Sequence, residues 1–304
     1  MDDVDRLPSM TVTARRYTSE PGFTDDFFAV REFLVRINAD RVTTPGFLWG
    51  RWEWAFCLPY LDRDALNRIG VWESDGEVVG LVTYEEGPGD AYFAVDPAHR
   101  GLLPEMVDHA LTHLRHDGKV RLMVSDWDRD LQRIVHSRGL RATDGRDGNS
   151  VLDLTEPLEY AAPDGYRVIS LADDGDAYRF DRLLWRGFGH PGDAPETPEQ
   201  LEWRRLSMTG GPDQVPELNI AVVAPDGEYA AYCGVWHDPR TDYALVEPVC
   251  TDPDHRLRGC GRAAVLEALR RCAARGATTA YVGSNQLFYY AMGFAPHETG
   301  TWWA

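Results

Sequence analysis

Residues 249–262 read VCTDPDHRLRGCGR, a short apolar run that leads through a proline and two glycines into a helical pattern. Gly259 and Gly261 stand where that helix begins, so several backbone N–H groups and the positive end of the helix dipole point toward one place. Glycine has no Cβ, which lets an anion approach the backbone closely. The stretch therefore predicts an anion site, and a pyrophosphate is the ligand it favours.

The predicted strands, turns and helices around this loop occur in the same order in both halves of the chain. Turn residues and helix ends recur in the same order at separations of 151 to 158 residues, which indicates a tandem duplication. Each half contains a hairpin, a strand, a helix with one apolar stripe, a strand, a helix and a final strand. The matched positions are Asp75 with Asp226, Pro97 with Pro253, Gly118 with Gly276, and Gly139 with Gly293.

This plan predicts an α/β layered protein of two tandem domains, each a mixed, mostly antiparallel sheet flanked by helices. We expect the boundary in the proline-containing stretch 155–165, which gives domains 1–157 and 158–304. After residues 293–294 only ten residues remain, so one strand of the second domain is expected to be missing. The first domain, or a second chain in a homodimer, would then cover the exposed sheet edge.

The composition excludes several classes of function. The 304 residues include 31 Lys and Arg against 49 Asp and Glu, a net charge of −18 that argues against a broad nucleic-acid surface. Residues 1–6 show no signal peptide, and no apolar run approaches the roughly 20 residues of a membrane span, so we expect a cytoplasmic protein with no membrane partner. Five cysteines without a C-x-x-C pair indicate neither a disulfide framework nor a cysteine-rich zinc site.

Two common phosphate loops fit this stretch poorly. A Walker loop requires G-x-x-x-x-G-K-[ST], which is absent here. Residues 259–264, GCGRAA, match the dinucleotide pattern G-x-G-x-x-A, but that pattern expects a carboxylate about 20 residues later at the end of the next strand. The next strand ends in VGSN at 282–285, without a carboxylate. The dinucleotide interpretation is therefore the weaker one.

A third comparison fits better. The loop that starts at Arg256 reads R-x-x-G-x-G, three residues after Pro253 at the end of a strand. This resembles the [RQ]-x-x-G-x-[GA] loop of the GNAT superfamily of acetyl-CoA-dependent N-acetyltransferases. That superfamily also has a tyrosine four residues before a Gly-Phe pair, and Tyr289 stands in that position before 293–294. Loop, tyrosine and element order together identify the second half as similar to a GNAT domain.

The resemblance implies acetyl-CoA as co-substrate and direct transfer of its acetyl group to a primary amine of a small molecule or peptide. The loop backbone would hold the pyrophosphate, and the strand before it would pair with the pantetheine arm. Tyr289 would be the acid that protonates the leaving thiolate. Asn285 precedes this tyrosine by four residues rather than the family's usual seven. The cofactor-binding residues implied are Val249, Cys250, Thr251, Arg256, Leu257, Arg258, Gly259, Cys260, Gly261, Arg262 and Asn285.

Attack by an amine also requires a base. Glu247, on the strand that leads to the loop, is our candidate, acting directly or through water. The competing interpretation is a solvated strand residue, and His237 and Asp242 are alternative bases. An acceptor pocket walled by tryptophans is a further prediction, although aromatic residues at such spacings also form cores. The tryptophans concerned are Trp185, Trp203 and Trp236.

The first half lacks these features. Leu103 and Glu105 stand where the two glycines of the loop belong, and the carboxylate would repel a pyrophosphate. Val135 replaces the tyrosine four residues before Gly139. The first half therefore resembles a GNAT domain that has lost its cofactor site.

Two other patterns in the sequence have simpler structural explanations. His109, His113 and His116 have the spacing of metal ligands, but they lie opposite the apolar stripe and lack the Glu of H-E-x-x-H, so we expect a solvated helix face and no metal. Cys260 at a helix N-terminus predicts a lowered thiol pKa. Direct transfer needs no thiol nucleophile, so a packing role is expected for it.

Two other functions remain open. One is an acyltransferase that uses a different acyl-CoA, as in mycothiol-synthase-like tandem proteins. The other is a non-catalytic sensor that binds acyl-CoA. The acceptor pocket is built from loops, so the sequence does not name the acceptor.

Overall fold

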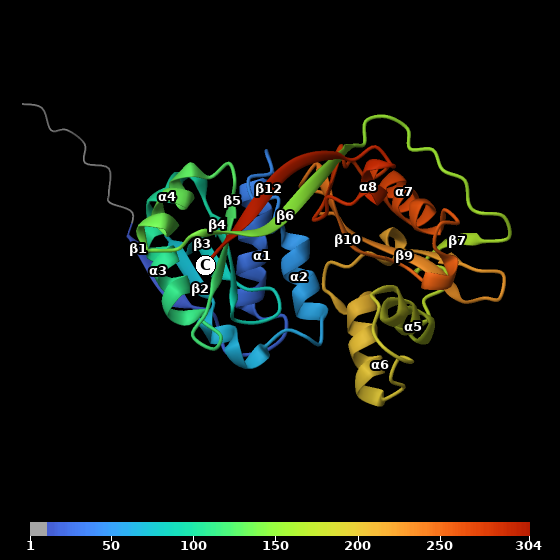
Figure 1. Ribbon diagram of the computed structural model, residues 1–304, viewed down its shortest axis with the longest axis horizontal. Helices are drawn as coiled ribbons and strands as arrows, with labels where there is room; N and C mark the ends of the chain where they lie inside the picture. The colour runs from blue at the N-terminus through green and yellow to red at the C-terminus, as the bar shows by residue number, and fades with distance from the viewer. Residues whose placement is uncertain (1–10) are drawn as a thin grey trace, which may run out of the picture. The chain divides into compact units, whose positions relative to one another are not determined.

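The computed structural model describes residues 11–304, which form two compact units (Figure 1). Unit 1 comprises the described residues up to Ile37, together with Asp62–Gly145 and Thr301–Ala304, and unit 2 comprises Asn38–Leu61 and Arg146–Gly300. Residues 1–6, where the sequence shows no signal peptide, lie outside the described part. Within residues 11–304, every helix is too short or too polar to cross a bilayer.

Unit 1 is a sheet with the strand order β1-β2-β3-β4-β5 followed by β12. The first four strands pair antiparallel, and β4 pairs with β5 in parallel. Asp75 and Gly76 have φ of 52° and 85°, the left-handed conformation that an Asp-Gly hairpin turn requires. The elements are β1 (Val12–Arg16), α1 (Asp25–Asn38), β2 (Gly70–Ser74), β3 (Glu77–Thr83), β4 (Asp90–Val95), α3 (Leu103–His113), β5 (Arg121–Ser125) and α4 (Arg129–Ser137).

Unit 2 is a sheet with the strand order β6-β11-β10-β9-β8-β7. Strands β7 to β10 pair antiparallel, while β10 and β11 are parallel. One face packs on α7 and the other on α5 (Figure 1). The elements are β7 (Arg167–Ser170), α5 (Ala177–Gly187), α6 (Pro198–Arg205), β8 (Ile220–Val223), β9 (Tyr229–Trp236), β10 (Tyr243–Thr251), α7 (Cys260–Ala273), β11 (Thr279–Val282) and α8 (Leu287–Tyr290).

The predicted apolar stripes do face these sheets. Met106, Val107 and Ala110 of α3 are fully buried, and so are Val265 and Leu269 of α7. Small residues on α7 let its axis approach the sheet closely, and together with β8, β9 and β10 they form the larger core of unit 2. The fold class predicted from the sequence, a mixed and mostly antiparallel sheet flanked by helices, is thus confirmed for each unit.

Each unit takes a terminal strand from the opposite half of the sequence. In unit 2, residues 150–153 of β6 (Ala142–Asp153) pair antiparallel with β11, which fills the place of the strand that the sequence analysis found missing. In unit 1, the end of β12 (Ala295–Trp303) takes the equivalent place: Arg141 and Ala304 exchange backbone hydrogen bonds of 2.9 and 3.0 Å. Trp302 is buried there, with Arg121 lying 4.7 Å above the centroid of its ring.

Helix α2 (Trp49–Cys57) is also part of unit 2, although it precedes β2 in the sequence. The rings of Trp49 and Trp54 lie 6.0 and 6.4 Å from that of Trp236 on β9. A Cβ on Gly50 would come within 2.6 Å of the Trp236 side chain, so only glycine permits this approach. Domains 1–157 and 158–304 remain our proposal for the duplicated halves, while the contact units exchange these segments.

The exchanged strand β6 yields a test of the fold. Leu152 is buried in the core of unit 2 and pairs with Ala280 of β11. We expect Leu152→Ala to destabilise unit 2 by about 2–4 kcal/mol, because a cavity is left in that core. Hydrogen exchange of the β11 amides measures this loss. Val151→Ala, on the other face of the same strand and only half buried, is the control. Faster exchange in β2 and β3 with β11 unchanged would contradict the strand assignment.

Candidate functional site

The site begins where two parallel strands separate. Strands β10 and β11 pair only over Tyr243–Leu245 and Thr279–Tyr281. Beyond Leu245, β10 continues to Thr251, whereas β11 ends at Val282. From Val246 onward, β10 therefore turns an edge of backbone N–H and C=O groups toward the gap instead of toward β11. An extended ligand that carries amide groups can add to such an edge in the manner of a strand.

A β-bulge shapes this edge. The pairing of β10 with β9 shifts between Val246 and Val249, which leaves Glu247 and Pro248 as the bulged residues. Gly234 of β9 lies opposite, where a Cβ would come 2.7 Å from the Glu247 carbonyl oxygen. The indole Nε1 of Trp236 donates a hydrogen bond of 2.9 Å to the same oxygen. The bulge is therefore fixed from β9, and Glu247 is held at the start of the open edge.

The predicted anion loop connects this edge to α7. Leu257 and Gly259 have φ of 60° and 89°, so the chain turns twice through the left-handed region just before the helix begins. Successive residues of this kind point their N–H groups into one concave site. Gly261 has a different role: a Cβ there would lie 2.7 Å from the Thr251 hydroxyl and 3.2 Å from the Phe288 ring. One glycine thus permits the turn, and the other permits the packing beneath it.

Unit 1 has no such turn in the corresponding described segment. Residues Pro97–Leu102 form a 3₁₀ helix that runs directly into α3, and the segment 97–105 contains no residue of positive φ. The Leu103 side chain is buried, and Glu105 accepts a hydrogen bond of 3.0 Å from the indole of Trp72. The left-handed turn that precedes α7 in unit 2 therefore has no counterpart in this segment of unit 1, where a 3₁₀ helix with a kink at His99 leads into α3.

Tyr289 lies on α8 with Glu247 among the groups that influence its titration. The Tyr289 ring packs edge-on against Phe294 at 5.5 Å. Burial raises the pKa of the Tyr289 hydroxyl well above its usual value, and the neighbouring Cys233 and Glu247 raise it further. The hydroxyl is consequently protonated throughout the neutral range, as a proton donor must be. Glu247 itself is half buried and close enough to influence that titration.

The other candidate bases lie elsewhere in unit 2. His237 is buried, with Nδ1 3.0 Å from the Tyr243 carbonyl oxygen and Nε2 3.5 Å from that of Arg275. Asp242 lies in the preceding turn, where its carbonyl oxygen accepts the amide of Thr278 at 2.7 Å. Both positions are at the paired end of β10 and β11 rather than at the open edge.

Other predicted residues make different contacts. The Asn285 side chain lies about 3 Å from where a Cβ on Gly148 would stand, so it packs beside β6. Trp185 stacks on His190 at 4.5 Å and donates to the carbonyl oxygen of Gly192 at 3.1 Å. Trp203 is a half-buried residue of α6. Of the three tryptophans, Trp236 is the one that contacts the bulge.

Two sequence expectations need correction. Burial raises the pKa of the Cys260 thiol, so the lowered value expected at a helix N-terminus is wrong, because the side chain turns into the core and is 1% exposed. The histidines of α3 are not a simple solvated face: His109 packs on Trp72, with its Nε2 2.8 Å from the Arg68 carbonyl oxygen. Helix α3 ends at His113, so His116 lies beyond it. Across residues 11–304, no group of His, Cys, Asp and Glu has the geometry to hold a metal ion.

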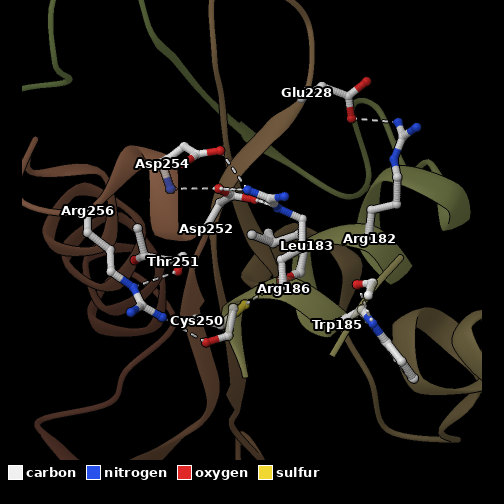
Figure 2. A network of polar contacts seen from close by, with 12 residues as sticks. Arg182, Leu183, Trp185, Arg186, Glu228, Cys250, Thr251, Asp252, Asp254 and Arg256 are labelled. Carbon is white, nitrogen blue, oxygen red and sulfur yellow. Dashed lines mark hydrogen bonds and ion pairs between the residues drawn. The ribbon is translucent and has the colours of Figure 1, made fainter. Parts of the chain in front are cut away.

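A residue that the sequence analysis missed supports the loop from α5. Arg186 pairs with both Asp252 and Asp254 at the beginning of the turn that leads to Arg256 (Figure 2). No local pattern signals this contact, because the arginine and the two carboxylates are 66 and 68 residues apart. Only the fold brings them together.

Comparison with known proteins agrees with this geometry. Residues 177–294 match the model of the Acetyltransferase (GNAT) family. A GCN5-related N-acetyltransferase from Sphaerobacter thermophilus has a similar fold, with 17% sequence identity, a TM-score of 0.57, and coverage of 96% of this chain and 94% of that one. A tandem GNAT protein from the clavulanic acid biosynthesis pathway has 17% identity, a TM-score of 0.62, and coverage of 96% and 98%. No curated protein matches the sequence.

A less similar solved structure contains a bound acyl-CoA with a longer acyl group. The structure of Saccharomyces cerevisiae N-myristoyltransferase with bound myristoyl-CoA shares the fold at 11% identity, with a TM-score of 0.56 and coverage of 98% of this chain and 79% of that one. Residues 177–294 of the second half are thus similar to the GNAT acetyltransferase family model, and the chain shares its fold with these solved structures. The tandem GNAT arrangement predicted from the sequence is confirmed at the level of fold.

Proposed function

We propose that this protein is an N-acetyltransferase that transfers the acetyl group of acetyl-CoA directly to a primary amine of a small molecule or peptide. The working site lies in residues 158–304, and the first half binds no cofactor. One observation carries the proposal: the open edge of β10 is followed, after the short 3₁₀ turn Pro253–His255, by the left-handed turn at the start of α7. An acyl-CoA needs both features, an amide-binding edge and an anion cradle, in this order.

The residues present suit such a ligand. A Cβ built on Gly259 would meet only Pro163, at 3.8 Å, so space above the turn is open. Backbone N–H groups of residues 257–262 would hold the diphosphate, and the exposed Arg258 adds positive charge. Cys250 and Cys260 are buried, so they would contribute their backbone and not their thiols. Thioester chemistry is supplied by the co-substrate, while the chain supplies position and proton transfer.

Two side chains would move the protons. Glu247, at the start of the open edge, would accept a proton from the attacking amine, directly or through water. Tyr289 would donate its proton to the departing thiolate, since burial keeps the hydroxyl protonated. N–H groups of the β10 edge would stabilise negative charge on the reacting carbonyl oxygen. The five described cysteines are all free, which suits a reducing compartment such as the cytoplasm.

Replacing the proposed acid tests its role. We expect Tyr289→Phe to lower kcat by about 10- to 1,000-fold with little change in the KM for acetyl-CoA, because the lost proton donor acts only in the chemical step. Tyr290→Phe, the adjacent half-buried tyrosine, should keep wild-type turnover. Release of free thiol from acetyl-CoA measures both. Unchanged turnover of Tyr289→Phe at saturating substrate, across the pH range, would remove this tyrosine from the mechanism.

A second variant tests the proposed base. We expect Glu247→Gln to lower kcat/KM and to abolish the acid limb of the pH–rate profile, because an amide cannot accept the proton of the amine. Asp242→Asn, which neutralises the exposed carboxylate named as an alternative base, should keep the acid limb if Glu247 is the base. A profile for Glu247→Gln that superimposes on the wild type would exclude Glu247 and favour His237 or Asp242.

The contrast between the two loops predicts one acetyl-CoA per chain by calorimetric titration. Gly261→Glu copies the charge of Glu105 into the working loop, and like charges at about 4–5 Å cost roughly 3–4 kcal/mol at an effective dielectric constant near 20. That variant should therefore bind acetyl-CoA more than about a hundredfold less tightly. Gly101→Glu, in the open surroundings of the unit 1 loop, should have no effect. Two sites in the wild type, or an intact site in Gly261→Glu, would contradict this assignment.

A further inference from the structure

The turn that begins the anion loop is held by an arginine from another helix. Arg186, in the last turn of α5, donates from Nε to Asp252 Oδ2 at 2.6 Å and from Nη2 to Oδ1 at 3.1 Å. Nη2 also reaches Asp254 Oδ2 at 2.6 Å. Figure 2 shows the guanidinium facing both carboxylates. A two-point contact of this kind fixes direction as well as distance.

Asp252 is the centre of this arrangement. Its side chain is 11% exposed, and Oδ1 also accepts the backbone N–H of Asp254 at 2.9 Å, which closes the 3₁₀ turn Pro253–His255. Burial alone would raise the pKa of Asp252, but the hydrogen bonds from Arg186 and from the Asp254 amide outweigh it and hold the pKa below its usual value. The carboxylate is therefore charged whenever the neutral-pH enzyme is folded.

A second arginine connects the loop and α5 in the opposite direction, from the loop to the helix. Arg256 extends from the loop to the end of α5, where its Nη2 donates to the Gly187 carbonyl oxygen at 3.1 Å. At Gly187 a Cβ would stand 2.8 Å from the Cys250 Cβ, so α5 touches β10 at this point. The end of the open edge and the start of the anion loop are thus attached to one helix terminus. Loops that bind anions through the backbone depend on such fixed N–H directions.

Arg186 also offsets negative charge close to the proposed diphosphate site. Asp252 and Asp254 lie within the turn that precedes the N–H groups proposed to hold a diphosphate. Two uncompensated carboxylates there would repel that ligand. Arg186 neutralises part of this charge where it arises, although it lies outside the loop and outside the R-x-x-G-x-G pattern.

We propose that Arg186 is a positioning residue for acyl-CoA: it holds the 252–256 turn in its binding geometry and offsets the charge of Asp252 and Asp254. This inference rests on the proposed function, because Arg186 would act by helping the same site to bind its anionic co-substrate. Arg186 does not contact the reacting atoms. Its effect is on the affinity for the diphosphate end of the co-substrate and not on the transfer step.

The helix itself provides a matched control. Arg182 lies one turn earlier on α5, is about as exposed as Arg186, and pairs with Glu228 at 2.6 Å, a contact that does not involve the loop (Figure 2). We expect Arg186→Gln to raise the Kd for CoA about tenfold or more, and Arg182→Gln to leave it within about twofold. Arg186→Lys should be intermediate, because one ammonium cannot reproduce a planar fork that bonds two carboxylates. Titration calorimetry on the full chain, with CoA as the probe, measures all three.

Kinetics, thermal melting and a second substitution distinguish an effect on the geometry of the loop from a general loss of protein stability. In Arg186→Gln the KM for acetyl-CoA should rise while kcat at saturation stays within about threefold of the wild type. Thermal melting should show similar small losses for Arg186→Gln and Arg182→Gln, since each removes ion pairing from the same helix. Adding Asp254→Asn to Arg186→Gln should recover part of the CoA affinity, because one uncompensated charge is removed.

The outcomes are distinguishable. A selective loss of CoA affinity in Arg186→Gln supports the inference. Equal CoA affinity in the wild type, Arg186→Gln and Arg182→Gln overturns it and leaves the proposed function intact. Equal losses in both variants also overturn it, because the helix as a whole would then be responsible. A wild-type chain that does not bind CoA overturns the proposed function, and this inference falls with it.

Discussion

Backbone pairing between β10 and β11 stops after three residues, and the rest of the site depends on that interruption. Had the two parallel strands paired along their length, the edge groups of Val246–Thr251 would be used inside the sheet and no ligand could bond to them. The bulge at Glu247 turns β10 away, and Gly234 and Trp236 hold the bulge in place from β9. Beyond Leu245, the backbone groups on this side of β10 are therefore not paired with β11.

The loop beside that gap shows how two nearby glycines can meet different needs. Gly259 provides a left-handed backbone, and Gly261 provides space against Thr251. In unit 1 the equivalent positions carry Leu103 and Glu105, which lie in the first turn of α3, where Leu103 is buried and Glu105 accepts a hydrogen bond from Trp72. A duplicated fold can therefore keep its sheet and its core without the left-handed turn that precedes α7 in the other copy.

Much of this was predictable from the sequence, and the exceptions have a common cause. Local patterns predicted the Asp75-Gly76 turn, the apolar faces of α3 and α7, and a glycine turn at the start of α7, since each depends on residues close in the chain. Arg186, the Trp236 bond to the bulge and the place of α2 depend on residues distant in sequence. The predicted lowering of the Cys260 thiol pKa was wrong for a related reason. Burial, which the local pattern does not show, raises this pKa by more than the helix N-terminus lowers it.

The exchanged strands have a consequence for how the molecule is made. Unit 1 includes Thr301–Ala304, so its sheet lacks a strand until almost every other residue of both units has been synthesised. Unit 2 includes Asn38–Leu61, which must wait for β9 and β10 to emerge before α2 can pack on Trp236. Domains commonly fold in order as they leave the ribosome. Here unit 1 cannot be completed until all of unit 2 has been synthesised, so folding of the two halves is linked in time, and nascent chains carry an unpaired strand edge in unit 1 until synthesis reaches the end of β12.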